Sequence, residues 1–363
     1  MKFVHLANVE LGAAGPELPR ILGDYREARH EDFKKALALC KNEKADALFV
    51  TGDLFCHEPS AEELENLDRE LEKYGELRII ILPGLLDHAS VGSAYATYRW
   101  KSNTTVFIGD CIQRVFLKKL DCEVTGCGYN TDTWSKVKPE KISRGKKGSL
   151  QIVLLPFLGQ DGSEASFETA NTFEFEADYI GLGQKVRISG PNGTAIYAPG
   201  LFEPEEYAER PCHGCFLVTA DAKGQKANVS AKFVPLCGHE MLTVKVSAYR
   251  GLSYDDTERL IEEAIGKYGK EHVYRILIQG EASPSLYIQR DRLYQLGNIT
   301  EICDETDRRA TLEQMQADCD TENPDVVALF LKGLTEVTDE DVRKKAMEFG
   351  IQALLKQEER DES

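Results

Sequence analysis

The sequence of 363 residues has few histidines and no long apolar run. A bilayer-spanning helix needs roughly 20 consecutive apolar residues, whereas the most apolar stretch, residues 79–86, is interrupted by Pro83 and Gly84. Residues 1–7 reach the polar Asn8 too early for the apolar centre of a signal peptide. We therefore expect a cytoplasmic protein with no membrane partner. The small number of histidines, seven, restricts the metal sites that can depend on imidazole.

Basic residues are in the minority, with 44 Lys and Arg against 61 Asp and Glu and a net charge of −17. Proteins that coat nucleic acids gain affinity by neutralising phosphates with Lys and Arg, so the composition argues against that class. The excess of acidic residues is unevenly distributed along the sequence. Residues 304–363 hold 17 acidic and 8 basic residues, a net charge of −9. DNA binding by the less acidic remainder is therefore not excluded. The ten cysteines are spread thinly, which predicts reduced thiols rather than a disulfide framework.

The first part of the chain alternates short apolar runs with amphipathic helical patterns. Strands are predicted at residues 2–7, 47–50 and 78–82, and helices at 26–43 and 60–75. This order is typical of right-handed crossovers and a largely parallel sheet. Ligands of such sheets bind at the carboxyl ends of the strands, which is where candidate site residues are sought.

From about residue 105 short strands follow one another, which suggests a second sheet packed on the first. Residues 240–290 have the pattern of a small α+β module, and the last sixty residues look helical and acidic. We predict an α/β protein in three parts, at residues 1–238, 239–303 and 304–363.

Seven segments carry a resemblance to a known family. The loops after the first three strands resemble the opening motifs of calcineurin-like metallophosphoesterases, and more closely those of the SbcD and YhaO branch of DNA repair exonucleases. The segments that match are residues 6–12, 51–55, 83–88, 178–183, 196–204, 274–280 and 346–355, so the resemblance covers nearly the whole chain. It implies a four-layer α/β/β/α sandwich at residues 1–238, a small α+β capping domain and a helical tail.

The same resemblance implies hydrolysis by two metal ions, yet most of the family's ligand positions are replaced. In the first motif, Asn8 replaces the family's Asp and Glu10 replaces a His. In the third motif, Leu85 replaces an Asn and Leu86 replaces the catalytic His. Further along, Leu155-Pro156 replaces a His at a strand end, and Gln184 and Val186 replace the last His pair. Asp53 stands intact at the bridging position. Leucine, proline and valine side chains offer no lone pairs to a cation, so the two-metal site is predicted to be lost.

A reduced metal site is one alternative. Glu10, Asp53, Asp87 and either His57 or His88 lie on loops that should converge at one sheet edge. Oxygen-rich clusters suit a single Mg²⁺ or Mn²⁺ ion. The other interpretation is that Asp53 accepts backbone N–H bonds and the remaining side chains are solvated.

A zinc site is a second candidate. A hairpin of two strands could bring Cys212, Cys215, Cys237 and His239 together, and zinc takes four such ligands in a tetrahedron. Against this, Cys215 begins a strand with alternating side chains, so packing cysteines are the alternative.

Two further segments suggest partners. Lys136, Lys138, Lys141, Arg144, Lys146 and Lys147 form a basic loop that could contact phosphates or simply be solvated. The acidic C-terminal segment carries apolar residues at helical spacing, which are most often core. By resemblance, this region would contact an SbcC-like ATPase of the SMC family, and SbcD relatives commonly dimerise through their first domain.

Three functions follow from these observations. The first is an SbcD/YhaO-like protein that has lost hydrolysis and binds or regulates an SbcC-like ATPase or DNA. The second is a phosphodiesterase that uses one ion held by Asp53, Glu10 and Asp87. The third is a protein-interaction module without nucleic-acid binding. No cofactor is expected in the first case; otherwise a single Mn²⁺ or Mg²⁺ ion or a structural zinc is expected.

Overall fold

The computed structural model divides the chain into two compact units. The first consists of Met1–Glu206 and Pro211–Glu240, and the second of Tyr207–Arg210 and Met241–Ser363. The residues that the structure describes are 1–13, 25–90, 92–109, 111–130, 141–145, 148–156, 174–190, 195–208, 212–221, 227–283, 286, 288–307, 326–339, 342–343, 345–347 and 349–350.

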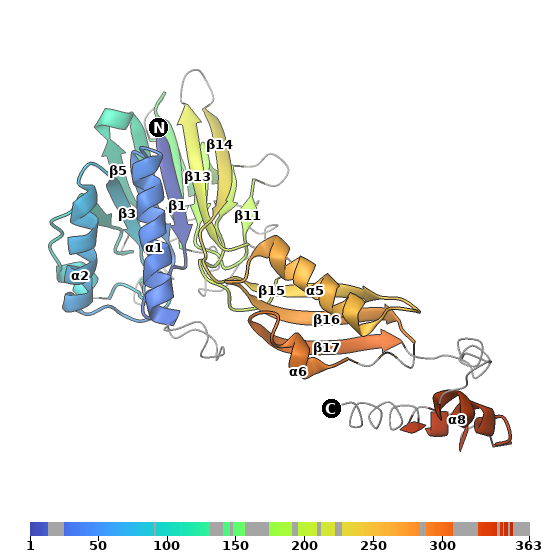
Figure 1. Ribbon diagram of the computed structural model, residues 1–363. Helices are drawn as coiled ribbons and strands as arrows, with labels where there is room; N and C mark the ends of the chain where they lie inside the picture. Colours follow the sequence, from blue (N-terminus) through green and yellow to red (C-terminus); the bar gives the residue numbers. More distant parts are fainter. Residues whose placement is uncertain are drawn as a thin grey trace. The chain divides into compact units, whose positions relative to one another are not determined.

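A mixed sheet of six strands forms the first layer of the first unit (Figure 1). Its order is β14 (Asn228–Pro235), β13 (Gly214–Asp221), β1 (Lys2–Ala7), β2 (Ala47–Thr51), β3 (Arg78–Leu82) and β4 (Thr104–Val106). The strands from β1 to β4 are parallel, whereas β13 and β14 are antiparallel to their neighbours. The predicted strands at 2–7, 47–50 and 78–82 are therefore confirmed.

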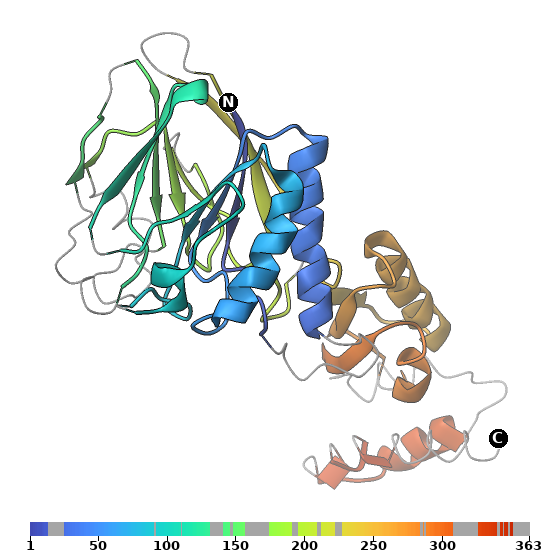
Figure 2. The same cartoon turned by 90° about the vertical axis from the view of Figure 1, so that its left-hand side faces the viewer.

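Helices cover one face of this sheet (Figure 2). They are α1 (Tyr25–Asn42), α2 (Ala61–Leu71) with the 3₁₀ turn η2 (Glu72–Tyr74), and the short α3 (Ala94–Thr97). Helix α2 begins with a capping box, in which Ser60 Oγ accepts from Glu63 N–H and the Glu63 carboxylate accepts from Ser60 N–H. A cluster of buried apolar residues from both helices and the sheet fills the space between them.

The second six-stranded sheet packs on the other face of the first. Its order is β11 (Ile188–Ser189), β12 (Ile196–Ala198), β10 (Tyr179–Leu182), β8 (Leu150–Leu155), β6 (Cys122–Gly126) and β5 (Gln113–Leu117), with the 3₁₀ turn η3 (Lys118–Leu120) between β5 and β6. The core between the sheets contains Phe3 and Phe49 from the first sheet and Tyr179 from the second. The rings of Phe3 and Tyr179 lie 5.0 Å apart at 83°, a favourable edge-to-face arrangement.

The α/β class is thus confirmed, and the four-layer arrangement is seen in part. The outer face of the second sheet packs against buried Ile142 and partly buried Phe175, which belong to the paired short strands β7 (Lys141–Ile142) and β9 (Glu174–Phe175). No α-helix covers that face within the described ranges. The second helical layer of the predicted sandwich is therefore not observed there.

The second unit contains a three-stranded parallel sheet, β15 (Met241–Ala248), β16 (Val273–Glu281) and β17 (Ile299–Asp307). Helices α5 (Tyr254–Tyr268) and α6 (Arg290–Leu293) belong to the same part, and α8 (Val326–Leu334) follows. Strand β17 pairs with β16 as far as Asp307, so the prediction that the helical segment begins at residue 304 is wrong. Every helix in the described part of the chain falls short of the length or apolar character that a bilayer span requires.

Phe49 tests the packing between the two sheets. Because its ring is completely buried in that core, Phe49→Ala should lower the free energy of unfolding by about 3–5 kcal/mol. Chemical denaturation followed by circular dichroism measures the change. Phe116→Ala, at a side chain that is 36% exposed, is the control and should cost clearly less; equal losses would contradict the face-to-face packing.

Candidate functional site

Loops from both sheets meet where the parallel strands end. A Cβ on Gly183, just after β10, would lie 2.7 Å from the backbone nitrogen of Gly52, just after β2. A Cβ on Gly52 would lie 2.5 Å from Asn8 Oδ1, on the loop after β1. Three loops that are distant in sequence are therefore in close contact, as the strand order predicts.

The loop after β1 has an unusual backbone. Asn8 and Glu10 adopt positive φ angles of 46° and 51°, a left-handed conformation that is uncommon outside glycine and is more easily adopted by Asn than by Glu. Hydrogen bonds hold this loop against the one after β2, with Glu10 N–H donating to Asp53 O over 3.0 Å. Such strain persists only where surrounding contacts impose it.

Asp53, which the resemblance places at the bridging ligand position, accepts a hydrogen bond from the protein backbone. Its Oδ1 accepts the N–H of Leu86 at 2.8 Å. A Cβ on Gly84 would come within 2.2 Å of the same oxygen, so only glycine fits there. Burial raises the pKa of Asp53, although the Leu86 N–H and the nearby charge of Lys185 oppose the shift.

Asp87 is completely buried and accepts four hydrogen bonds. Its Oδ1 accepts from Gly84 N–H at 2.7 Å, and its Oδ2 accepts from Leu54 N–H, Phe55 N–H and Tyr95 O–H at 2.9, 3.2 and 3.0 Å. Burial, followed by the Asp53 charge, raises the pKa of Asp87 to about 7. Because both oxygens already have donors, this carboxylate ties the loops after β2 and β3 together.

Glu10 is paired with a cation from helix α1. Its Oε2 lies 3.5 Å from Arg29 Nη1, and Arg29 Nη1 also donates to Val9 O at 2.9 Å. Both side chains are buried, and Glu10 Oε1 finds no hydrogen-bond partner among the described residues. Burial raises the pKa of Glu10, while Arg29 lowers it.

Apolar side chains are exposed on the loops after β3 and β10. Leu85 and Leu86 are 41% and 44% exposed, and Val186 is 66% exposed. Gln184, in contrast, is buried. Three of the positions where the resemblance expects metal ligands thus present hydrocarbon to solvent.

The two-metal site implied by the resemblance does not fit these residues. Within the described ranges, groups of three or more His, Cys, Asp or Glu side chains with ligand atoms within 4.8 Å occur at two places, and neither includes Glu10, Asp53, Asp87 or His88. The structure brings Asp53 and Asp87 close together but does not assemble the single-ion site considered above.

The remaining nearby histidines lie in other environments. His5 is completely buried, with Tyr179 Oη and Thr51 Oγ1 each 2.8 Å from its ring nitrogens, and burial lowers the pKa of His5 to about 3. The ring of His88 packs against Tyr129. His57 is half-exposed and contacts Glu63 Oε1 at 2.9 Å.

The predicted zinc ligands are not brought together. Cys215 lies in the core between the first sheet and its helices, because side chains alternate along β13. Cys212 groups with His213 and Glu240, and Cys237 with Asp32 and Glu203. His239 belongs to neither of these described groups, so the set of Cys212, Cys215, Cys237 and His239 is corrected.

The group at Cys212 is centred on an ion pair. Glu240 Oε2 lies 2.5 Å from His213 Nδ1, and Glu240 Oε1 accepts the N–H groups of Cys212 and His213, both at 2.9 Å. Burial opposes the charge of the imidazole, but hydrogen bonds with Cys212 and Glu240 raise the pKa of His213 to about 9. Glu240 is the last residue of the first unit, so the ion pair with His213 holds the C-terminal end of that unit in place.

Arg144, one of the residues of the basic loop considered for phosphate contact, is bound within the protein instead. The guanidinium of Arg144 makes two hydrogen bonds to the carboxylate of Asp178, at 3.0 and 2.9 Å, and a third to Ser149 O. Arg144 is therefore a structural residue. Lys136, Lys138, Lys146 and Lys147 lie outside the described residues, as does the side chain of Lys141.

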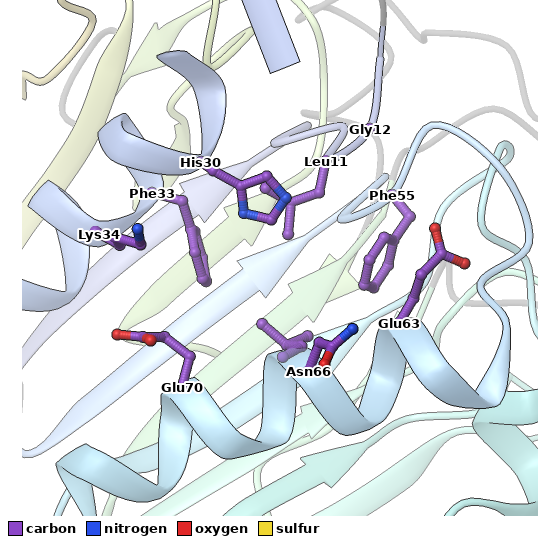
Figure 3. Close-up of a pocket in the computed structure, with 10 residues that line it drawn as sticks. Leu11, Gly12, His30, Phe33, Lys34, Phe55, Glu63, Asn66 and Glu70 are labelled. Atoms are coloured by element: carbon purple, nitrogen blue, oxygen red, sulfur yellow. The ribbon is translucent and has the colours of Figure 1, made fainter. Parts of the chain in front are cut away.

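A cavity of about 260 Å³ lies between α1 and α2. Figure 3 shows side chains of the two helices facing each other across it, with His30, Phe33 and Lys34 opposite Asn66 and Glu70. Its lining includes Leu11, Gly12 and Phe55 from the strand-end loops but neither Asp53 nor Asp87. The cavity therefore adjoins the candidate site without containing its carboxylates.

Sequence reasoning missed Arg29, Asp32, Glu203 and Glu240. One signal was available: Arg29 and Asp32 lie on the same face of α1 as Phe33, Ala36 and Cys40, where charged residues are unexpected. Comparison with models of known families finds no match to the chain. Comparison with curated proteins finds no significant match either. The resemblance to SbcD-like proteins accordingly stays a prediction.

Asp87→Asn tests the role of the buried carboxylate. An amide offers one acceptor oxygen and a donor NH₂ group, so at least one loop N–H must lose its partner. We expect a loss of roughly 2–4 kcal/mol in the free energy of unfolding, measured by denaturant titration. Asp53→Asn is the control: its carboxylate accepts the Leu86 N–H at the edge of the loops and is 7% exposed, so the change should cost less, about 1 kcal/mol. A larger loss for the control would contradict the assignment.

The His213–Glu240 pair predicts that the free energy of unfolding depends on pH. Because folding raises the pKa of His213 from 6.5 to about 9, its stabilising contribution is complete below pH 6.5 and is lost as pH rises through 9. The difference in unfolding free energy between the wild type and His213→Asn should be about 3 kcal/mol near pH 6 and should shrink strongly near pH 10.

The half-exposed His57–Glu63 pair supplies a matched control for this measurement. His57→Asn should cost no more than about 1 kcal/mol. A His213→Asn effect that is independent of pH would show that the imidazole contributes by packing alone.

Proposed function

We propose that the chain is a non-hydrolytic protein of the SbcD- and YhaO-like metallophosphoesterase type, which serves as a binding or regulatory subunit. The proposal is supported by two sheets packed face to face with loops converging at their strand ends. It also rests on the residue-by-residue resemblance described above.

One observation carries the loss of hydrolysis. Asp53 keeps the bridging position, but the side chains of Leu85, Leu86 and Val186 are exposed where ligands are required. A two-metal phosphodiesterase holds its ions about 3.5–4 Å apart and needs several oxygen or nitrogen ligands around them. A surface of hydrocarbon side chains cannot clamp a phosphodiester in that way.

Exposed apolar side chains in the second unit support the proposal of a protein partner. Val326 and Leu329, on α8, are 54% and 59% exposed, and Phe349 is 67% exposed. Phe330 of α8 packs against Gly350, where a Cβ would come within 2.2 Å of its ring, so the two segments are in contact. Contiguous exposed apolar patches mark interaction surfaces, and we propose that these side chains belong to one. By resemblance, the proposed partner is an SMC-family ATPase.

A protein partner is favoured over DNA by the engagement of Arg144. Its guanidinium makes three hydrogen bonds, to Asp178 and Ser149. The basic loop then contains one fewer cation for phosphate contacts, while the chain as a whole has a net charge of −17.

Manganese-dependent hydrolysis tests this function. The purified full chain should release product from bis(4-nitrophenyl) phosphate and from end-labelled linear DNA no faster than the Asp53→Ala variant. The reason is that neither metal site has its ligands. The measurement is the initial rate with Mn²⁺ added, together with the manganese content of the dialysed protein. Turnover above that of Asp53→Ala would support the single-ion enzyme instead, and two bound manganese ions would overturn the proposal.

A further inference from the structure

A second cluster of metal-ligating side chains lies in the first unit, apart from the carboxylates of the strand-end site. Asp32 projects from α1, Glu203 follows β12, and Cys237 follows β14. One ligand atom from each residue lies within 4.8 Å of the other two. Asp32 and Glu203 are each only 2% exposed, and Cys237 is partly buried.

Glu203 is the incompletely satisfied member of this cluster. Its Oε2 accepts from the Cys237 thiol at 3.2 Å. Its Oε1 is buried and has no hydrogen-bond partner in the described part of the chain. An unpartnered, buried carboxylate oxygen beside a second carboxylate and a thiol leaves a place for a cation.

The partners of Asp32 hold that carboxylate in position. Gly238 N–H donates to Asp32 Oδ2 at 2.8 Å, and Lys35 Nζ contacts Asp32 Oδ1 at 2.5 Å. Each carboxylate oxygen has two lone pairs, so these donors leave acceptor capacity on Asp32. Supporting donors of this kind commonly orient metal ligands.

The donor set identifies the class of ion. Mg²⁺, Ca²⁺ and Mn²⁺ prefer oxygen ligands alone, whereas a thiolate combined with carboxylates suits zinc. Three protein ligands leave the fourth tetrahedral position to solvent.

We propose that Asp32, Glu203 and Cys237 bind one zinc ion. The ion links α1 to the ends of β12 and β14, three elements far apart in sequence. On binding, the Cys237 S–H bond breaks, the sulfur bonds to zinc, and the proton leaves to solvent. A proton held between Glu203 and Asp32 would be displaced in the same way.

The experiment measures zinc in the full-length protein, purified without chelator and dialysed against metal-free buffer. Mass spectrometry of the metals should find one zinc per chain in the wild type, and at least a tenfold lower content in Cys237→Ser and in Glu203→Gln. Cys303→Ser, in the second unit, and Glu205→Gln, at an exposed carboxylate next to the cluster, are matched controls and should retain the zinc.

Cobalt provides a readout that does not depend on the folding of a variant. Wild-type protein stripped of metal and titrated with Co²⁺ should develop a near-ultraviolet absorption from thiolate-to-cobalt charge transfer, which zinc then abolishes. A wild type without zinc or cobalt absorption would overturn the proposal in favour of a proton shared by Glu203 and Asp32. Zinc that persists in Cys237→Ser but disappears in Cys212→Ser would also overturn it. Neither result bears on the manganese assay, so the two proposals fail separately.

Discussion

The loops at the ends of β2 and β3 depend on one buried carboxylate, that of Asp87. A completely buried carboxylate is costly unless donors satisfy it, and here three backbone N–H groups and a tyrosine hydroxyl do so. These donors come from both loops and from α3, so the carboxylate fixes the distance between the loops. The position of Asp53 and the backbone bond from Leu86 follow from that distance. A residue that belongs to a metal-site motif by resemblance therefore acts here as the structural centre of the loops.

Charge compensation by protein groups is the common feature of the strand ends. Glu10 lies against Arg29, Asp53 accepts a backbone N–H, and the charge of Lys185 acts on both carboxylates. In a two-metal enzyme the ions would balance this negative charge. Substituting backbone dipoles and cationic side chains for ions keeps acidic residues buried without requiring a metal. Leu85 and Leu86 can then be exposed beside these carboxylates, because no metal ion has to be bound there.

The fold was largely predictable because local patterns determine it. The strands β1, β2 and β3 are short buried runs, and the capping box at Ser60 marks the start of α2. Strand β17 was not predicted, because only Ile299 and Ile302 are buried along an otherwise polar and largely acidic segment. Two apolar residues three positions apart fit a helix as well as a strand. Pairing with β16, which no local pattern reveals, decides between them.

The candidate site was predictable in place but not in its contacts. Parallel strands bring residues 8–10, 53 and 87 to one edge by topology alone, whereas the pairing of Glu10 with Arg29 or of Cys237 with Asp32 depends on how α1 packs on the sheet. The alternation of β13 directs Cys215 into the core, which separates it from Cys212. Where α1 meets the sheet it carries both Arg29 and Asp32, so one helix supplies a cation to Glu10 and an anion to the group around Glu203 and Cys237. At the first contact a carboxylate faces a cation, whereas at the second two carboxylates and a thiol lie together. Glu10 Oε1 and Glu203 Oε1 are both buried without a hydrogen-bond partner among the described residues. The proposed zinc ion is placed at the second contact because a thiol joins two carboxylates there, whereas the first contact pairs a carboxylate with a guanidinium.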